Sequence, residues 1–164
     1  MIIPPVSGEP IASPWGIAVS NLLNSPPRCL LSRAAGQSFA NGTGSLILVT
    51  FGAADVVENT HGFFDDATDS IKIPVGMAGL YQVHWYIEFA QNGTGARRYG
   101  MRLNGSNYQH QFDGTTTGSS PQGGGNSVIM RLAEANYLQV VGAQSSGAAL
   151  LTSKVLLQAL RIGE

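Results

Sequence analysis

Charged side chains are scarce in this 164-residue chain, where Asp, Glu, Lys and Arg make up 12% of the residues. An ordinary soluble domain carries about twice that fraction. The formal net charge is −1, and Arg97-Arg98 is the only adjacent basic pair. Nucleic-acid binding needs clustered Lys and Arg to neutralise phosphates, so we expect no nucleic-acid partner. A neutral surface, or one covered by other subunits, accounts for so few charges, and we favour an oligomer.

Cysteine is also nearly missing, because Cys29 is the only one. A single cysteine excludes an internal disulfide and a thiolate metal cluster. We expect Cys29 to be a small apolar side chain within a strand.

Long apolar runs are missing as well. No segment approaches the ~20 apolar residues of a membrane span, so we expect no membrane insertion. The first residues lack the basic and apolar regions of a secretory signal, and several prolines interrupt them. We therefore expect a protein that is made and kept in a cytoplasm, or that leaves it by another route.

The most regular stretch that is present covers residues 79 to 90, where apolar residues alternate with polar ones. A period of two is typical of a strand with one face in a core. Turn residues flank the stretch on both sides, which favours an antiparallel neighbour. The predicted core and trimer-packing residues are Tyr81, Val83, Trp85, Ile87 and Phe89.

Shorter strand patterns fill residues 28 to 164, which we predict to form one domain. Turn signals recur every dozen residues or so, a spacing typical of a β-sandwich or jelly roll. The glycine-rich residues 114–126 are predicted to be a flexible loop, and Asn41-Gly to Gly44 a turn. The nine or ten predicted strands cover residues 28–33, 45–51, 56–58 (a short extended piece), 70–74, 79–90, 98–103, 107–112, 127–133, 137–143 and 154–162.

Residues 1–27 have a different character. Prolines exclude a helix or central strand in the first 13 residues, and Ser13-Pro14 is a typical helix start. We predict an extended arm and a short helix, too small to be stable alone. This arm would attach the protein to a larger structure through Pro4, Pro5, Trp15, Ile17, Leu22 and Leu23.

The order of the motifs resembles the globular head shared by complement one-q and tumour necrosis factor. That family has a G-x-F/W element, a P-x-x-G-x-Y strand, an L-x-N-G hairpin and a final apolar strand. The resemblance covers about residues 28 to 163 and implies an antiparallel jelly-roll sandwich. The matching elements are Thr60-His-Gly-Phe63, Ile73-Pro74, Gly79-Leu-Tyr81-Gln-Val83, Arg102-Leu-Asn-Gly105, residues 128–132 and Leu160-Arg-Ile162.

The whole chain also resembles small head or tail structural proteins of double-stranded DNA bacteriophages. The resemblance implies a trimeric, ten-stranded jelly roll displayed on a virion. There is no fibre or collagen-like stalk upstream, which favours capsid decoration or a head fibre over a tail tip. The matching segments are Trp15-Gly16 to Val19, Pro26-Pro-Arg-Cys29, Pro74 to Tyr81 and Asn92-Gly-Thr-Gly-Ala-Arg-Arg98.

Two patterns suggest metal sites. His84 and Glu88 share a strand face and resemble the cupin metal motif, but that motif needs a histidine where Tyr86 stands. A cupin-like metal enzyme is therefore a remote alternative. Three carboxylates, Asp65, Asp66 and Asp69, suit Ca²⁺ by type but follow no EF-hand spacing. With no Gly-x-Ser-x-Gly elbow either, we predict no enzyme, no catalytic residue, no metal and no cofactor.

Candidate ligand contacts surround the predicted loop. Arg97, Arg98 and Arg102 are expected mainly in ion pairs or stem packing at a subunit edge. An anionic ligand is the alternative, and an adhesin for host-surface glycan would use such contacts. The three Asn-Gly-Ser/Thr sequons fit hairpin turns better than glycosylation. The possible ligand contacts are Arg97, Arg98, Tyr108 and His110.

Together these patterns predict a structural virion protein that works by binding. It would form a homotrimer and hold a major capsid or other virion protein through residues 1–27. Either face of the 79–90 strand could line the trimer axis. The competing interpretation is a tail-fibre or receptor-binding adhesin; a cellular signalling ligand would need a secretion or membrane signal.

Overall fold

The structure is a computed structural model that describes residues 26–34, 36–107, 112–115 and 120–164. Within these ranges the chain is almost entirely β, and one turn of 3-10 helix, η1 (Ala53–Asp55), is the exception. The strands form two antiparallel sheets packed face to face. The predicted all-β antiparallel sandwich is confirmed. No helix among the described residues is long and apolar enough to cross a membrane.

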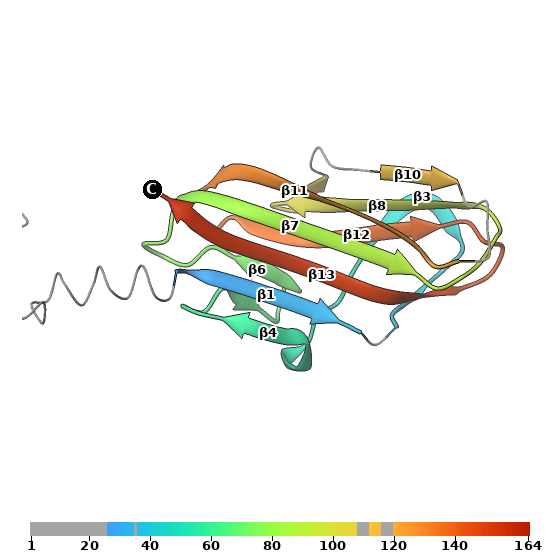
Figure 1. Cartoon of the computed structure of the whole chain (residues 1–164), viewed down its shortest axis with the longest axis horizontal. Coiled ribbons are helices and arrows are strands. Elements are labelled where there is room, and N and C mark those ends of the chain that lie inside the picture. Colours follow the sequence, from blue (N-terminus) through green and yellow to red (C-terminus); the bar gives the residue numbers. More distant parts are fainter. Residues whose placement is uncertain (1–25, 35, 108–111, 116–119) are drawn as a thin grey trace, which may run out of the picture.

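The first sheet has the longest described strand, β13, at its centre (Figure 1). Its order is β11-β7-β13-β1-β4, and β2 pairs with β13 beside this path. Every pairing is antiparallel, with β13 held between β7 and β1. The strands are β1 (Arg28–Arg33), β2 (Ser38–Phe39), β4 (Val56–Asn59), β7 (Gly79–Phe89), β11 (Gln122–Leu132) and β13 (Leu150–Gly163).

The second sheet runs in the order β10-β8-β12-β6-β5, and β9 pairs with β8. Strand β3 (Gly42–Leu48) lies beside β12, and the Val49 N–H that follows it donates to the Val140 carbonyl at 2.9 Å. The strands of this sheet are β5 (Phe64–Asp65), β6 (Ser70–Lys72), β8 (Ala96–Leu103), β9 (Ser106–Asn107), β10 (Phe112–Thr115) and β12 (Tyr137–Gln144).

The core lies between the sheets and contains one whole face of β7. The aromatic rings there meet mainly edge to face, as between Phe39 and Phe89 at 5.2 Å and between Phe63 and Tyr81 at 6.1 Å. All five predicted core residues are buried in this single chain: Tyr81, Val83, Trp85, Ile87 and Phe89. The trimer-packing part of that prediction needs correction, because side chains enclosed in their own core cannot contact another copy.

Several strand predictions match the structure closely. Strand β1 covers residues 28–33 as predicted, and β7 ends one residue before the predicted limit. Asn104 and Gly105 both have positive φ, 53° and 75°, as a tight primed hairpin requires. Their turn joins β8 to β9.

Two predictions about glycine-rich segments are wrong. The expected turn at residues 41–44 overlaps β3, which begins at Gly42 and ends before the predicted strand does. The expected loop at 114–126 contains the end of β10 and the first residues of β11. Those first β11 residues pair with Trp85 to Phe89 of β7. Pairing with β7 therefore holds them in a strand, although glycine has a low strand propensity.

One end of the molecule gathers the start of the described body and the end of the chain (Figure 1). The Arg161 N–H of β13 donates to the Pro27 carbonyl at 2.9 Å. Residues 1–25, with the predicted attachment side chains, lie outside the described residues, as do Tyr108 and His110.

Candidate interaction face

The outer side of the first sheet presents a broad surface that no other described strand covers. We call it the open face. Its side chains stand in cross-strand rows, because strand register aligns the outward positions of neighbouring strands. One row holds Ser127, His84, Gln158, Leu30 and, on the edge strand, Glu58; the next holds Gly125, Tyr86, Leu156 and Ser32; a third holds Ile129, Gln82, Leu160 and Arg28.

Most of the open face is apolar or uncharged. Leu30, Leu156 and Leu160 are half-buried among their neighbours, and Ile129 is 62% exposed. The two glutamines, Gln82 of β7 and Gln158 of β13, are diagonal neighbours on adjacent strands. An uncharged surface with apolar side chains at its centre is typical of a protein–protein interface.

Charged groups of the open face lie at its margins. Arg28 and Glu58 form an ion pair on β1 and β4, and the hydrogen bond from Arg28 lowers the pKa of Glu58. Lys154 of β13 stands opposite Glu88 of β7 in the row beyond Tyr86. Such a distribution, with charges at the rim and neutral groups inside, is also found at subunit interfaces.

Two polar clusters stand on β7. The His84 Nδ1 and the Ser127 hydroxyl are 2.8 Å apart. The Tyr86 hydroxyl donates to Glu88 Oε2 at 2.8 Å, and Ser153 also contacts that carboxylate. Burial, followed by the hydrogen bond to Glu88, raises the pKa of Tyr86 to about 12. Tyr86 is therefore a neutral donor at ordinary pH.

A hollow of about 360 Å³ lies on this face beside β11 and is lined by His84, Tyr86 and Gly123 to Gly125. Two of its three glycines are closely packed. A Cβ on Gly123 would lie 2.3 Å from the Tyr86 hydroxyl, and one on Gly125 would lie 2.3 Å from the Trp85 carbonyl oxygen. The tyrosine ring thus covers the part of the strand that has no side chains, an arrangement that supports glycine in sheets.

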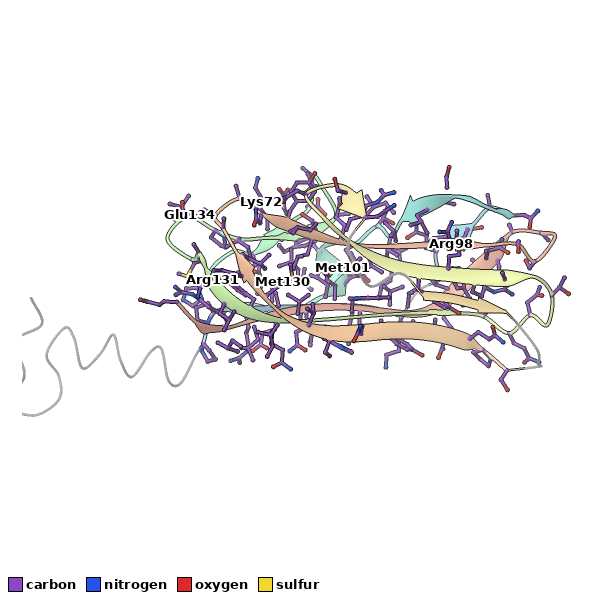
Figure 2. All side chains as sticks on the ribbon, turned by 90° about the horizontal axis from the view of Figure 1, so that it is seen from above. Lys72, Arg98, Met101, Met130, Arg131 and Glu134 are labelled. Atoms are coloured by element: carbon purple, nitrogen blue, oxygen red, sulfur yellow. The ribbon has the colours of Figure 1, made fainter. Side chains whose placement is uncertain are left out.

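The outer side of the second sheet is different. It carries Lys72, which pairs with Asp65 at 3.4 Å, and Arg102, which donates to the Asn107 side chain at 3.1 Å. Its outward Val141 and Ala143 are fully buried, and β3 lies beside their strand. Figure 2 shows Lys72 and Arg98 in separate parts of the molecule. This side therefore offers less uncovered apolar surface than the open face.

Arg97 does not lie at the surface, although it is one of the candidate ligand contacts. It is 0% exposed, and its guanidinium donates to the Asn92, Thr94 and Ala96 carbonyls at 3.0–3.1 Å. It also lies over the Phe89 ring, 5.9 Å from the centroid. Burial lowers its pKa. A surface ligand does not reach this group, so the ligand-contact proposal is kept for Arg98, Tyr108 and His110.

The residues considered for metal binding have other partners. Asp65 pairs with Lys72, and Asp69 accepts the Phe51 N–H at 2.9 Å. Glu88 is engaged by Tyr86 and Ser153 rather than by His84. Among the described residues, no group of three or more His, Cys, Asp or Glu is placed to hold a metal ion.

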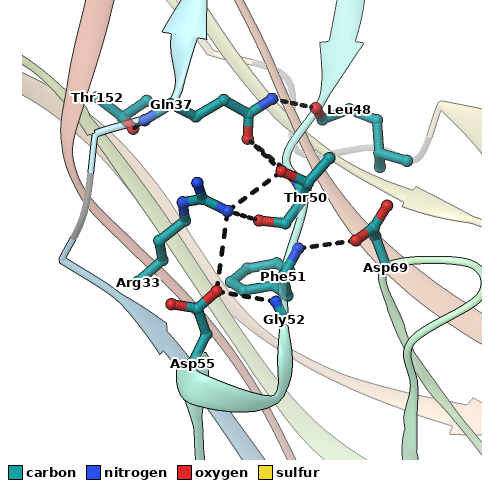
Figure 3. A network of polar contacts seen from close by, with 9 residues as sticks. All are labelled: Arg33, Gln37, Leu48, Thr50, Phe51, Gly52, Asp55, Asp69 and Thr152. Carbon is teal, nitrogen blue, oxygen red and sulfur yellow. Dashed lines mark hydrogen bonds and ion pairs between the residues drawn. The ribbon is translucent and has the colours of Figure 1, made fainter.

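A polar network joins the end of β1 to the segment that follows β3 (Figure 3). The Gln37 side chain donates to the Leu48 carbonyl and accepts the Thr50 N–H, both at 2.8 Å. Arg33 contacts Thr50 and lies 3.8 Å from Asp55. These groups satisfy one another, so the network holds the crossing between the two sheets rather than forming a binding site.

Sequence reasoning missed most of the open face. Leu30, Leu156 and Leu160 come from strands that are far apart in the chain, so no local motif indicates that they share a surface. The burial of Arg97 did have a local signal, because Arg97, Tyr99 and Met101 occupy alternate positions of one strand and therefore share its face.

No family model matches the chain, and no curated protein does. Solved structures match most of it. The PRD1 vertex protein P5 is 17% identical, with a TM-score of 0.61 over 82% of this chain and 96% of that one. The globular domain of zebrafish complement 1qA is 14% identical, with a TM-score of 0.57 over 84% and 99%. The Eiger TNF of S. frugiperda is 9% identical, with a TM-score of 0.60 over 85% and 94%.

At these identities the likeness concerns the fold alone. The proteins named include a phage vertex protein, a complement domain and a tumour necrosis factor. With the strand order described above, they place this chain among the jelly rolls of the complement one-q and tumour necrosis factor type.

Proposed function

We propose that this protein is a structural component of a phage virion, a capsid decoration or head-fibre protein. Three copies associate through the open face, and residues 1–27 attach the trimer to a major capsid or other virion protein. The jelly roll then projects from the particle. The protein works by binding, with no catalytic step.

The observation that carries this proposal is the open face itself. Leu30, Leu156 and Leu160 form an apolar centre on a sheet whose inner side is already filled by the core. A second copy would remove this surface from water, at about 25 cal/mol per Å² of apolar area. In a closed symmetric oligomer every subunit uses the same contacts, so the open face of each copy would be buried. The similar PRD1 vertex protein supports a virion setting.

Self-association is tested first by Leu156→Asp. A carboxylate at the centre of the face would be desolvated in the assembly, so the variant should be monomeric where the unaltered protein is trimeric. Sedimentation velocity over a range of concentrations measures this. Val75→Asp is the matched control, because Val75 is 86% exposed and precedes β7 rather than lying on the open face. Loss of assembly in both variants, or in neither, contradicts this use of the face.

Particle attachment is tested with virions stripped of the protein. The full chain and a chain lacking residues 1–27 are each added, and binding is scored by sedimentation and electron microscopy. We expect saturable binding by the full chain only, with both chains still trimeric. If both ignore particles but bind host cells or glycans, decoration is wrong and the adhesin becomes the better account.

A further inference from the structure

His84 stands in the middle of the open face. Its row runs from Ser127 through His84 and Gln158 to Leu30, and all four of these groups are uncharged when the imidazole is neutral. The ring is half-buried, and its Nδ1 lies 2.8 Å from the Ser127 hydroxyl. Histidine changes charge near pH 6.5 when its surroundings do not perturb it. Beyond Leu30 the row continues to Glu58 on the edge strand β4, which is paired with Arg28. His84 is therefore the titratable group in the interior of this row, where a second copy would cover it.

The charged groups on the surrounding strands do not compensate an imidazolium. On β7, Glu88 is four residues from His84, about 13 Å along the strand, and is already bonded to Tyr86 and Ser153. On β4, Glu58 lies three strands away, about 14 Å, and is paired with Arg28. At the outward positions of these strands the remaining charged side chains are Lys154 of β13 and Arg131 of β11, both cationic; Arg33 of β1 and Arg161 of β13 are cationic too and share the alternation of the inner face.

We propose that association through the open face is coupled to the protonation of His84, so that copies assemble at neutral pH and separate in acid. This inference rests on the proposed function, because it needs copies that cover the face. A second copy that covers His84 removes water from its imidazole. No carboxylate of the described residues lies beside the ring to stabilise its charged form, so desolvation favours the neutral ring. The separated chain then binds more protons than the assembled one, so lowering the pH favours separation.

The size of the effect can be set from histidines in general. A histidine that titrates near pH 6.5 in the separated state and is kept neutral by burial weakens association by about tenfold per chain between pH 7.5 and pH 5.5. We therefore expect the concentration at which half of the chains are assembled to rise at least tenfold.

Sedimentation velocity at the two pH values tests this with three proteins. The unaltered chain should show the tenfold rise, and His84→Gln, which keeps a polar side chain but cannot become charged, should change less than threefold. His61→Asn is the matched control. His61 is exposed in the turn that follows β4, rather than on a strand of the open face, and has a φ of 77°, which asparagine tolerates. It should behave as the unaltered chain does.

The outcomes separate the two proposals. A chain that stays monomeric at pH 7.5 at every concentration overturns the proposed assembly and this inference with it. An assembly that is equally strong at both pH values overturns the inference alone, as does a His84→Gln protein that keeps the full dependence on pH. Circular dichroism at pH 5.5 confirms that the separated chains remain folded.

Discussion

At the scale of single residues, Arg97 is the only charged side chain that is fully buried among the described residues. Among the described residues it forms no ion pair. Its two terminal nitrogens donate to three backbone carbonyls instead, while its Nε is buried without a hydrogen-bond partner. Two of these belong to the connection between β7 and β8. The guanidinium therefore fixes the conformation of this connection from inside the molecule.

Replacing Arg97 with methionine should destabilise the fold by about 2 kcal/mol, because the stem is kept but the buried carbonyls lose their donors. Urea unfolding measures the change, and hydrogen exchange should show faster opening of residues 92–96. Arg98→Met is the control, since Arg98 occupies the opposite face of the same strand; it should cost less than about 1 kcal/mol. Equal losses in the two variants would contradict the role given to Arg97.

Cys29 has the opposite character, a reactive group made inert by its position. It is fully buried on the inner face of β1, and burial raises the pKa of its thiol to about 12. The thiolate is the reactive form, so the folded protein should resist thiol reagents at pH 8. A chromogenic disulfide reagent should label Cys29 rapidly in 8 M urea. In buffer without urea, labelling should proceed no faster than the protein unfolds. Rapid, complete labelling of the folded protein would show that the site is open.

At the scale of elements, β11 shows how pairing overrides local preference. Gly123 to Gly125 would disfavour a strand in isolation, yet they pair with Glu88, Ile87 and Tyr86 in regular register. The tyrosine ring packs over the positions where side chains are missing. The strand therefore depends on β7 for both its hydrogen bonds and its packing.

Gly125→Ala tests this dependence. The new Cβ would lie 2.3 Å from the Trp85 carbonyl oxygen, so β11 would have to shift, and we expect a loss of about 1–3 kcal/mol. Gly52→Ala is the matched control, because a Cβ there meets no atom within 4 Å and φ is −112°; it should change stability by less than about 0.5 kcal/mol. Thermal or urea unfolding compares the two. A neutral Gly125→Ala would mean that β11 is not held closely against β7.

At the scale of the whole molecule, the first and last strands of the described body are neighbours. β1 pairs residues 28–33 with residues 155–160 of β13, which lies between β7 and β1. Val155, Leu157 and Ala159 also fill the core. The fold is thus closed only when the C-terminal strand is in place, and contacts of such long sequence separation are typical of slow-folding β proteins.

A chain that ends at residue 149 should therefore not fold, because the removal of β13 exposes the edges of β7 and β1 and opens the core. A chain that begins at residue 26 should unfold at the same urea concentration as the full chain. Circular dichroism and the dispersion of amide proton signals distinguish these results. A cooperative unfolding transition in the chain without β13 would contradict the central place given to that strand.

Some features of this protein were determined by the sequence itself. The period-two pattern in residues 79–89 predicts both the strand and its buried face, because alternate side chains of any strand point to opposite sides. Asn104-Gly105 predicts a tight hairpin, since both residues tolerate positive φ. These predictions hold because their physical causes are local.

Other features were decided only by the tertiary structure. Residues 122–126 are a strand because β7 pairs with them, and the core residues of β7 are unavailable to another copy because the second sheet covers them. The open face brings Leu30 beside Gln158, residues that lie more than a hundred positions apart in the chain. Local preferences cannot specify such a surface, because strand order and register decide which side chains share it.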